Sequence, residues 1–336
     1  TRGSVLYFCM VEMSLINWMY NSSLNQFLGL FDDSIDKSEK AQLPQKRVEN
    51  IIDFLTYYVY RYVNRGLFEK DKITFTLIIC MKIMVTAGQL TYSDVGAFLR
   101  SGAALDIKSE RANQFSKWMP DKTWLNVLAL GRHNFAGEHM PFFKDLVEFI
   151  SRNESLWKDS WFDDNEPERA HIPDYEERIK SSREIGSFIR LTLVRSLRED
   201  RTVIAATNFI NDTLGKRFTD PVTDSMESIW SESDNRTPVL FLLSAGADPT
   251  SSIDDLAKKK KKFPTYKVSM GEGQEGPAFD RIKAGFQNGD WVILQNCHLG
   301  LGFMSQLEEI LGDPAAVIDP DFRLWLTGEP HPKFPI

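Results

Sequence analysis

The sequence predicts a large all-α part followed by an α/β part, in which helices flank a parallel sheet. Over most of the first two thirds of the chain, apolar residues recur at three- and four-residue steps, the period of an amphipathic helix. After about residue 235, short apolar runs alternate with helical stretches, which is typical of βαβ units. The content of 42% hydrophobic and 26% charged residues is that of a folded globular protein.

The helical part is predicted from a series of periodic stretches with one interruption. These stretches cover residues 4–35, 46–68, 69–88, 91–102, 123–131, 140–162, 182–200 and 201–215. The last one ends at Gly215, which suits the position after a helix C-terminus. Residues 163–177 break the pattern with acids and prolines, which favours an exposed connector.

The α/β part is predicted from four apolar runs and the helices between them. Strands are expected at 238–244, 265–270, 291–296 and 322–327, with helices at 251–263, 277–289 and 304–312. The near-continuous apolar run at 291–296 favours a sheet that is buried on both faces. We therefore expect a helical segment at 1–215 and a sheet domain at 216–336 that is incomplete. The chain has no initiator Met and is expected to be a fragment of a longer one.

Charge and cysteine content exclude several classes of protein. The net charge of −7 argues against a dedicated nucleic-acid binder, which usually carries a basic face. The three cysteines are far apart, which favours reduced thiols in the cytosol. No apolar run reaches the roughly 18 residues of a membrane-spanning helix.

A glycine pattern, Gly271-x-Gly273-x-x-Gly276, follows the second expected strand and resembles a dinucleotide-binding fingerprint. That fingerprint belongs after the first strand of such a sheet. Glu272 and Glu275 lie inside the loop, where they would repel a pyrophosphate. The pattern is therefore interpreted as a turn between strand and helix, with an oxidoreductase as the alternative.

The loop after the first strand is where a P-loop domain would bind phosphate, with the pattern G-x-x-x-x-G-K-[ST]. Here the loop reads "SAGADPTSS": it keeps Gly246 and Thr250, carries Asp248, and has no lysine. The third strand ends in Gln295 and Asn296, where a P-loop enzyme carries acids that hold Mg²⁺ and orient water. These five positions are predicted to be degenerate phosphate-loop and metal-binding positions, with no catalytic residue and no metal site among them.

Four stretches together carry a family resemblance: "TPVLFLLSAGADPTSSIDDLAKK", "VSMGEGQ", "GDWVILQNCHL" and "DFRLWLTGEPHPKFP". They resemble the sixth AAA+ module of dynein heavy chains. The helical part is similar to the segment that joins the fifth module to the sixth, and the likeness is most diffuse over 101–180. The stretch "WSESDNRTPVLFLLSAGADPT" looks most like the axonemal dyneins of the ciliary outer arm.

The resemblance implies a ring of six AAA+ modules, with ATP and Mg²⁺ bound in other modules and no cofactor here. It assigns residues 1–215 to the small part of the fifth module and the linker, and residues 216–336 to a truncated large subdomain of the sixth. It also implies an axonemal, cytoskeletal location, with the neighbouring modules, microtubules and the intermediate and light chains as partners. Nucleic acid and membrane are not expected partners.

Two other features have a functional and a structural interpretation. Lys258–Lys262 is a run of five lysines that could contact an acidic surface, but a solvated helix end is favoured because cations suit a helix C-terminus. Trp157 and Trp161 are four residues apart on an expected helix. Packing in the core is favoured for them over a binding platform.

Three further sets of polar residues are candidates for catalytic, metal-binding or phosphate-binding sites. Cys297 and His298 could form a nucleophile and its base, but adjacent residues leaving a strand point to opposite faces, so packing is favoured. His133 and His139 could bind a metal, but no cluster with zinc-like spacing surrounds them.

Arg195, Arg198 and Arg201 could reach a phosphate of a neighbouring module as arginine fingers. The favoured alternative is a set of surface ion pairs with Glu199 and Asp200.

The function predicted from the sequence is a non-catalytic, structural part of a dynein motor ring that supports minus-end-directed motility and ciliary beating. Two alternatives remain: an oxidoreductase that uses the Gly271–Gly276 loop, and an active P-loop ATPase whose motifs lie elsewhere in the chain.

Overall fold

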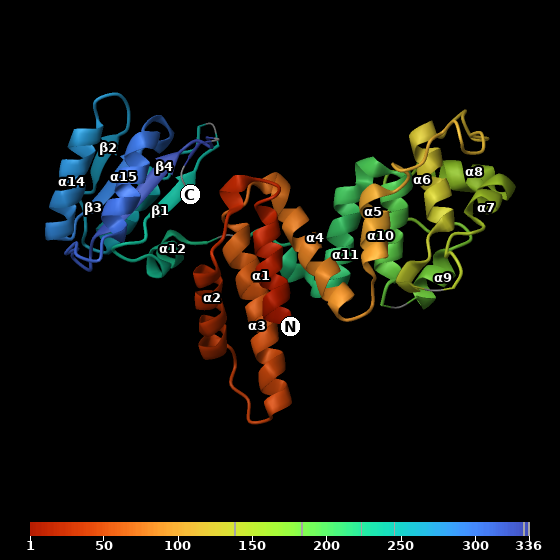
Figure 1. Cartoon of the computed structure of the whole chain (residues 1–336), viewed down its shortest axis with the longest axis horizontal. Helices are drawn as coiled ribbons and strands as arrows, with labels where there is room; N and C mark the ends of the chain where they lie inside the picture. The colour runs from red at the N-terminus through yellow and green to blue at the C-terminus, as the bar shows by residue number, and fades with distance from the viewer. Residues whose placement is uncertain (138, 183, 223, 245, 332, 335–336) are drawn as a thin grey trace. The chain divides into compact units, whose positions relative to one another are not determined.

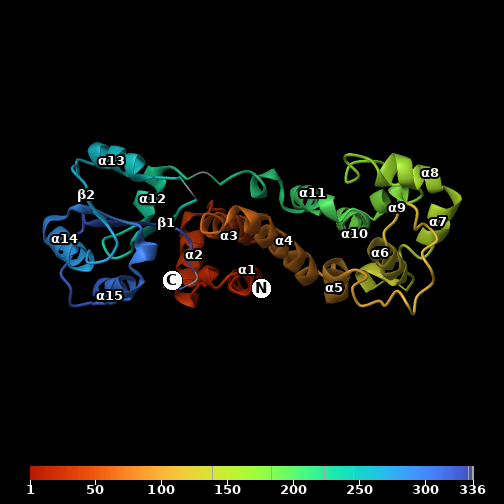
Figure 2. The same ribbon diagram turned by 90° about the horizontal axis from the view of Figure 1, so that it is seen from above.

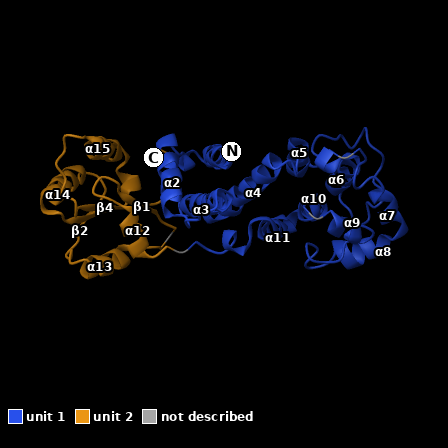
Figure 3. Ribbon diagram, turned by 90° about the horizontal axis from the view of Figure 1, so that it is seen from below, with its two compact units in different colours: residues 1–222 blue, residues 223–336 orange. Residues whose placement is uncertain are grey.

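The computed structural model describes residues 1–137, 139–182, 184–222, 224–244, 246–331 and 333–334. The chain divides into two compact units, residues 1–222 and 223–336, coloured separately in Figure 3. The first unit is helical and the second contains the sheet (Figure 1). No helix in the described part of the chain is both long and apolar enough to cross a membrane.

The first unit follows the predicted succession of helices. Its α-helices are α1 (Arg2–Met13), α2 (Leu24–Lys37), α3 (Pro44–Asn64), α4 (Glu69–Thr86), α5 (Tyr92–Arg100), α6 (Asp121–Arg132), α7 (Leu146–Arg152), α8 (Glu154–Trp157), α9 (Glu176–Ser181), α10 (Gly186–Leu197) and α11 (Thr202–Leu214). Short 3₁₀ turns are η1 (Trp18–Tyr20), η2 (Phe135–Gly137), η4 (Glu199–Arg201) and η5 (Lys216–Phe218), and η3 (Lys158–Phe162) is a π-helix.

The periodic stretch 4–35 forms two helices, because polar side chains bond to the backbone between them. Asn17 accepts a hydrogen bond from the amide of Met19, and Ser23 caps α2 by accepting one from the amide of Gln26. Such side chains offer the backbone an alternative to continued helix. The apolar period alone does not reveal this break.

The core of the first unit is centred on α10, which packs against α5, α6, α9 and α11. Apolar side chains on several faces of α10 are buried, among them Phe188, Leu191 and Val194. A helix that is apolar all round requires cover on every side. Helices α3, α4 and α11 can be followed in Figure 2.

The prediction that residues 163–177 form an exposed connector is wrong, because much of this segment is buried. Ile172 is completely buried, and Tyr175 packs against Phe143 with ring centroids 4.8 Å apart. Glu168 and Glu176 are also buried, each against an arginine. The acidic composition suggested solvent, but these carboxylates have partners inside the unit.

The division between units falls after residue 222, whereas the sequence suggested residue 215. Gly215 does end α11, with a φ of +94°. The chain then turns back in η5, where Phe218 packs against Tyr57 and Tyr60 with ring centroids 5.5 and 5.0 Å apart. This packing keeps the residues after Gly215 within the helical unit.

The second unit contains the four predicted strands in one parallel sheet of order β1-β4-β3-β2. Its elements are α12 (Met226–Glu232), β1 (Val239–Leu242), α13 (Thr250–Lys259), β2 (Tyr266–Ser269), α14 (Glu275–Asn288), β3 (Trp291–Gln295), η6 (Cys297–Leu299), α15 (Leu301–Gly312) and β4 (Arg323–Gly328). Because β2 lies at one edge, the Gly271–Gly276 loop follows an edge strand.

Helices cover both faces of the sheet, as Figure 2 shows. On one face, α13 buries Ile253 and Leu256 against Trp291, Ile293 and Trp325. On the other face, α14 and α15 pack on the side chains that alternate with these. This two-sided burial explains why β3 reads as a near-continuous apolar run.

Candidate functional site

The carboxyl ends of β1 and β3 bring the predicted degenerate positions to one edge of the sheet. The loop after β1 contains Gly246, whose φ of +82° is in the left-handed region that favours glycine. Thr250 is the first residue of α13 and Gln295 is the last of β3. In open α/β sheets ligands bind at this edge.

Three of the five positions form one hydrogen-bonded chain. The Gln295 Nε2 donates to Thr250 Oγ1 over 3.0 Å, and Thr250 Oγ1 donates to Asp248 Oδ1 over 2.5 Å. The Thr250 amide donates to the same carboxylate oxygen over 2.9 Å. These bonds from the Thr250 hydroxyl and amide lower the pKa of Asp248, so its carboxylate is ionised at neutral pH.

The residues in this arrangement do not suit the binding of Mg²⁺ and a nucleoside triphosphate. The Thr250 hydroxyl already has two partners, and one of them, Gln295 at the end of β3, is an amide without charge. The loop offers a carboxylate and no lysine, so it would repel phosphate. The hydrogen bonds among Asp248, Thr250 and Gln295 hold the described part of the loop in place.

Asn296, the other degenerate position at the end of the third strand, bonds to a different element from Gln295. Its backbone is left-handed, with φ of 57°, and its Nδ2 donates to Ser269 Oγ over 2.9 Å. The side chain therefore ties η6 to the edge strand β2.

The Gly271–Gly276 loop is exposed, and its geometry differs from that of a dinucleotide fingerprint. A Cβ atom added at Gly271, Gly273 or Gly276 would meet nothing within 4 Å in the chain. In the fingerprint, the third glycine is needed for close packing of helix on strand. Only Gly273 has a conformational reason to be glycine, because its φ is +78°.

Cys297 and His298 have separate partners. The Cys297 thiol is buried, donates to the carbonyl of Leu294, and has its pKa raised to about 12 by burial. The His298 Nδ1 accepts a hydrogen bond from the amide of Glu329 over 3.0 Å. A thiol in this state is not a nucleophile.

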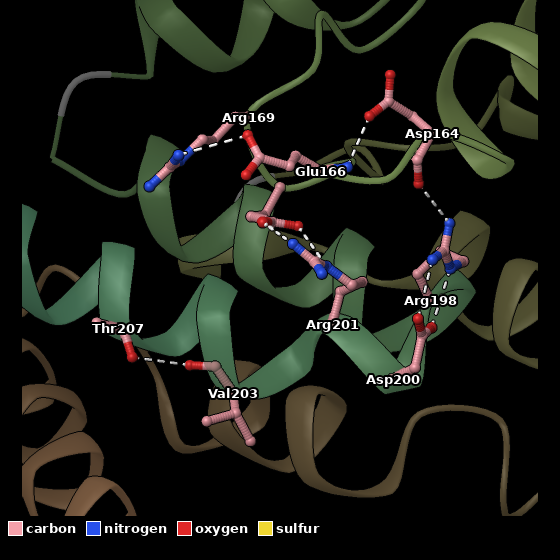
Figure 4. A network of polar contacts seen from close by, with 9 residues as sticks. Asp164, Glu166, Arg169, Arg198, Asp200, Arg201, Val203 and Thr207 are labelled. Carbon is pink, nitrogen blue, oxygen red and sulfur yellow. Dashed lines mark hydrogen bonds and ion pairs between the residues drawn. The ribbon is translucent and has the colours of Figure 1, made fainter.

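The three arginines have partners within the first unit, as Figure 4 shows for Arg198 and Arg201. Arg195 lies 3.5 Å from Glu199, and Arg198 makes two bonds of 2.9 Å to Asp200, as predicted. Arg201 differs from the prediction, because it pairs with the buried Glu168. These guanidinium groups are engaged by carboxylates of their own unit.

The lysine run spans the end of α13 and the turn after it. Lys258, Lys260 and Lys262 pair with Asp255, Glu227 and Asp321 at 2.9, 2.7 and 2.8 Å. Lys260 also lies 4.2 Å from the ring centroid of Trp230. These three lysines contact their own unit, in line with the structural interpretation.

His133 and His139 do not come together in a metal site. His133 donates from Nε2 to the fully buried Asp94 over 2.7 Å, while His139 is exposed. Among the described residues, no group of three or more metal-binding side chains is found.

Trp157 and Trp161 lie in the core, as favoured. Both are buried, with ring centroids 5.9 Å apart and an interplanar angle of 68°. The Trp157 indole donates to Asp174 over 3.1 Å. Trp157 is the last residue of α8, and Trp161 lies in the π-helix η3 that follows it.

One residue with a clear positioning role was missed in the sequence. Arg236 precedes β1, and its guanidinium donates to the carbonyls of Leu311, Asp313 and Ala316 at 3.0, 2.7 and 2.7 Å. It thereby satisfies carbonyls at the end of α15. A single arginine before a strand carries no signal for this contact.

Comparison with known proteins agrees with the geometry. Residues 234–336 match the family model described as "Dynein heavy chain region D6 P-loop domain". This range contains the whole sheet and the degenerate phosphate-loop positions.

Relatives match along the whole chain. The chain is 45% identical over 336 residues to the dynein gamma chain of the flagellar outer arm of Chlamydomonas reinhardtii. It is 46% identical over 337 residues to human dynein axonemal heavy chain 8, and 42% identical over 336 residues to mouse dynein axonemal heavy chain 5. Each match covers 100% of this chain and 7% of the relative. The chain therefore belongs to the dynein heavy chain family and corresponds to a short segment of such a heavy chain.

Proposed function

We propose that this chain is a non-catalytic, structural segment of an axonemal dynein heavy chain. The relatives are named as flagellar or axonemal dyneins, which supports a location in the ciliary or flagellar axoneme. In this proposal the parent chain moves towards microtubule minus ends, and ATP and Mg²⁺ bind in its other modules. Its partners are the neighbouring modules, the microtubule and the intermediate and light chains of the complex.

The observation that carries the non-catalytic role is the chain of hydrogen bonds from Gln295 through Thr250 to Asp248. Catalysis of phosphoryl transfer depends on positioned cations and on a group that orients the attacking water. The amide of Gln295 carries no charge, and Asp248 has the wrong sign beside a phosphate. The residues keep the shape of a phosphate loop while stabilising it internally.

A rigid segment without chemistry can still transmit motion. The sheet is covered on both faces, and α10 is buried among its neighbouring helices. Packed interfaces of this kind switch between discrete arrangements and do not deform gradually. We infer that the segment passes nucleotide-driven changes between neighbouring modules through contacts that differ in two states.

The two rival functions are less well supported by the same residues. An active ATPase needs the G-K-[ST] end of the phosphate loop, whereas counted from Gly246 these positions are Ser251, Ser252 and Ile253. An oxidoreductase needs the Gly271–Gly276 loop close to its helix, and the open space at each glycine argues against it.

Replacement of Thr250 with valine in the heavy chain that carries this segment tests the proposal. We expect ATPase rate and microtubule gliding velocity to stay within about twofold of the unmodified motor, because this hydroxyl contacts no nucleotide. The matched control is the same threonine-to-valine change in an intact phosphate loop of the parent chain, which should reduce the ATPase rate at least about 10-fold. A comparable loss from Thr250→Val, with the fold intact by circular dichroism, would overturn the non-catalytic role.

A further inference from the structure

The most acidic segment of the helical unit, residues 163–176, lies across α10 and η4, and we call it the strap. It contains six carboxylates and one arginine. We propose that the strap is a latch, closed by three guanidinium groups, which opens as one unit while α10 and α11 stay folded. The Arg201–Glu168 pair is its main fastening.

The Arg201–Glu168 pair is a bidentate contact on a buried carboxylate. Arg201 Nε and Nη2 donate to the two Glu168 oxygens over 3.0 and 2.5 Å. The Glu168 side chain is only 1% exposed, so the carboxylate depends on Arg201 for compensation of its charge. Burial would raise the pKa of Glu168, but the hydrogen bond from Arg201, a backbone hydrogen bond and the charges of Arg201 and Arg169 together lower that pKa below its ordinary value.

Arg190 of α10 provides the second fastening. Its Nη2 donates to both oxygens of Glu176 over 2.7 and 2.6 Å, and its Nη1 donates to the carbonyl of Ala170 over 2.9 Å. Glu176 also accepts a hydrogen bond from the amide of Ile172 over 2.9 Å. One guanidinium therefore holds both a side chain and the backbone of the strap.

Arg198 provides the third fastening, where the strap leaves the π-helix. Its Nη1 donates to the carbonyl of Phe162, and to that of Asp164 over 3.0 Å. Asp200 holds the other side of the guanidinium with two bonds of 2.9 Å (Figure 4). The strap is thus fastened near its start, its middle and its end.

The strap is suited to open as a unit, because its backbone bonds are local. The amides of Arg169 and Ala170 donate to the carbonyl of Glu166, and the amide of Glu176 donates to the carbonyl of Ile172. The guanidinium contacts connect it to α10 and η4, and the Trp157 indole of α8 donates to Asp174. The side chains of Ile172 and Tyr175 are buried. Segments fastened in this way form cooperative units that unfold below the global transition.

Hydrogen exchange on the full 336-residue chain tests the latch, with Glu168→Gln as the variant. This change leaves the Arg201 guanidinium facing a neutral amide, and the loss of one member of a buried pair is strongly destabilising. We expect the amides of Ala170, Ile172 and Glu176 to exchange on the order of 10-fold faster or more. Amides in the middle of α10 and α11 should stay within about twofold.

Arg169→Gln is the matched control, because Arg169 lies in the strap and pairs with the exposed Glu166 over 3.4 Å. It should leave exchange in the strap unchanged, as expected for a surface pair. Equal acceleration throughout the helical unit, or none in the strap, would overturn the latch. If Glu168→Gln fails to fold, exchange of the unmodified chain in increasing denaturant decides: strap amides must share one opening step that precedes that of α10.

Discussion

At the scale of residues, the same physics has the same outcome at two places. At the end of β1, Asp248, Thr250 and Gln295 satisfy one another, so a loop shaped to bind phosphate holds itself instead. In the helical unit, Arg201 and Glu168 pair in a buried setting, so a group that could contact a phosphate is engaged inside its own unit. In both places, the number of hydrogen bonds already made decides what the residue can do.

The buried Asp94 is expected to make the free energy of unfolding depend on pH. Burial would raise its pKa, but hydrogen bonds from His133 and Thr91 outweigh burial, and the pKa lies below its ordinary value of 3.8. The stability that Asp94 contributes is therefore present above pH 3.8 and is lost as the pH falls through the lowered value. Asp94→Asn should lower the free energy of unfolding at neutral pH by about 1–3 kcal/mol.

Urea unfolding of the unmodified chain and of Asp94→Asn, at neutral pH and at about pH 3, measures this contribution. The difference between the two proteins should shrink at the lower pH. A difference that stays constant with pH would show that the ionised carboxylate is not what stabilises this site.

The sequence predicts which residues lie at the phosphate-loop position, but it does not predict their contacts. Gln295 and Thr250 were assigned from the ends of predicted elements, whereas their hydrogen bond depends on how β3 and α13 meet in the fold. Glu168 was missed because acids next to prolines are typical of exposed loops. Only the tertiary structure shows the arginine that compensates its charge.

At the scale of elements, apolar patterns predicted the strands well. β1 and β4 lie within their predicted ranges to within a residue, and the helices between the strands follow in the expected order. Two features could not be predicted from the apolar pattern. The break between α1 and α2 is set by side-chain hydrogen bonds of Asn17 and Ser23, and the burial of 163–177 is set by arginines far away in the sequence.

Two glycines of α14 form a matched pair that tests its packing. A Cβ atom at Gly285 would lie 2.8 Å from the Phe322 ring and 3.2 Å from Val292, whereas one at Gly276 would meet nothing within 4 Å. Gly285→Ala should lower the free energy of unfolding by about 1–3 kcal/mol, because it overpacks the interface with the sheet. Gly276→Ala should be neutral or stabilising by up to about 1 kcal/mol, since alanine favours helix.

Chemical denaturation of both glycine variants measures this difference. A substantial loss of stability from Gly276→Ala would show that the loop packs more tightly than described. It would also restore the resemblance to a dinucleotide fingerprint, in which that glycine is required for packing.

At the scale of the whole molecule, the role that we propose for the two units is to brace without catalysis. The helical unit buries Glu168 and Glu176 against arginines, and the parallel sheet lies within the range that matches a P-loop family. The chain spans 7% of the length of the flagellar and axonemal dynein heavy chains that it matches. We propose that the sheet unit binds no nucleotide.

Isothermal titration of the chain with Mg-ATP, and separately with NAD, tests that claim most directly. The account predicts no saturable binding of either ligand at micromolar concentration, because the Thr250 hydroxyl is already bonded and the Gly271–Gly276 loop is open. Saturable NAD binding would support the glycine loop as a cofactor site. Micromolar binding of ATP that is lost in Thr250→Val would contradict the account.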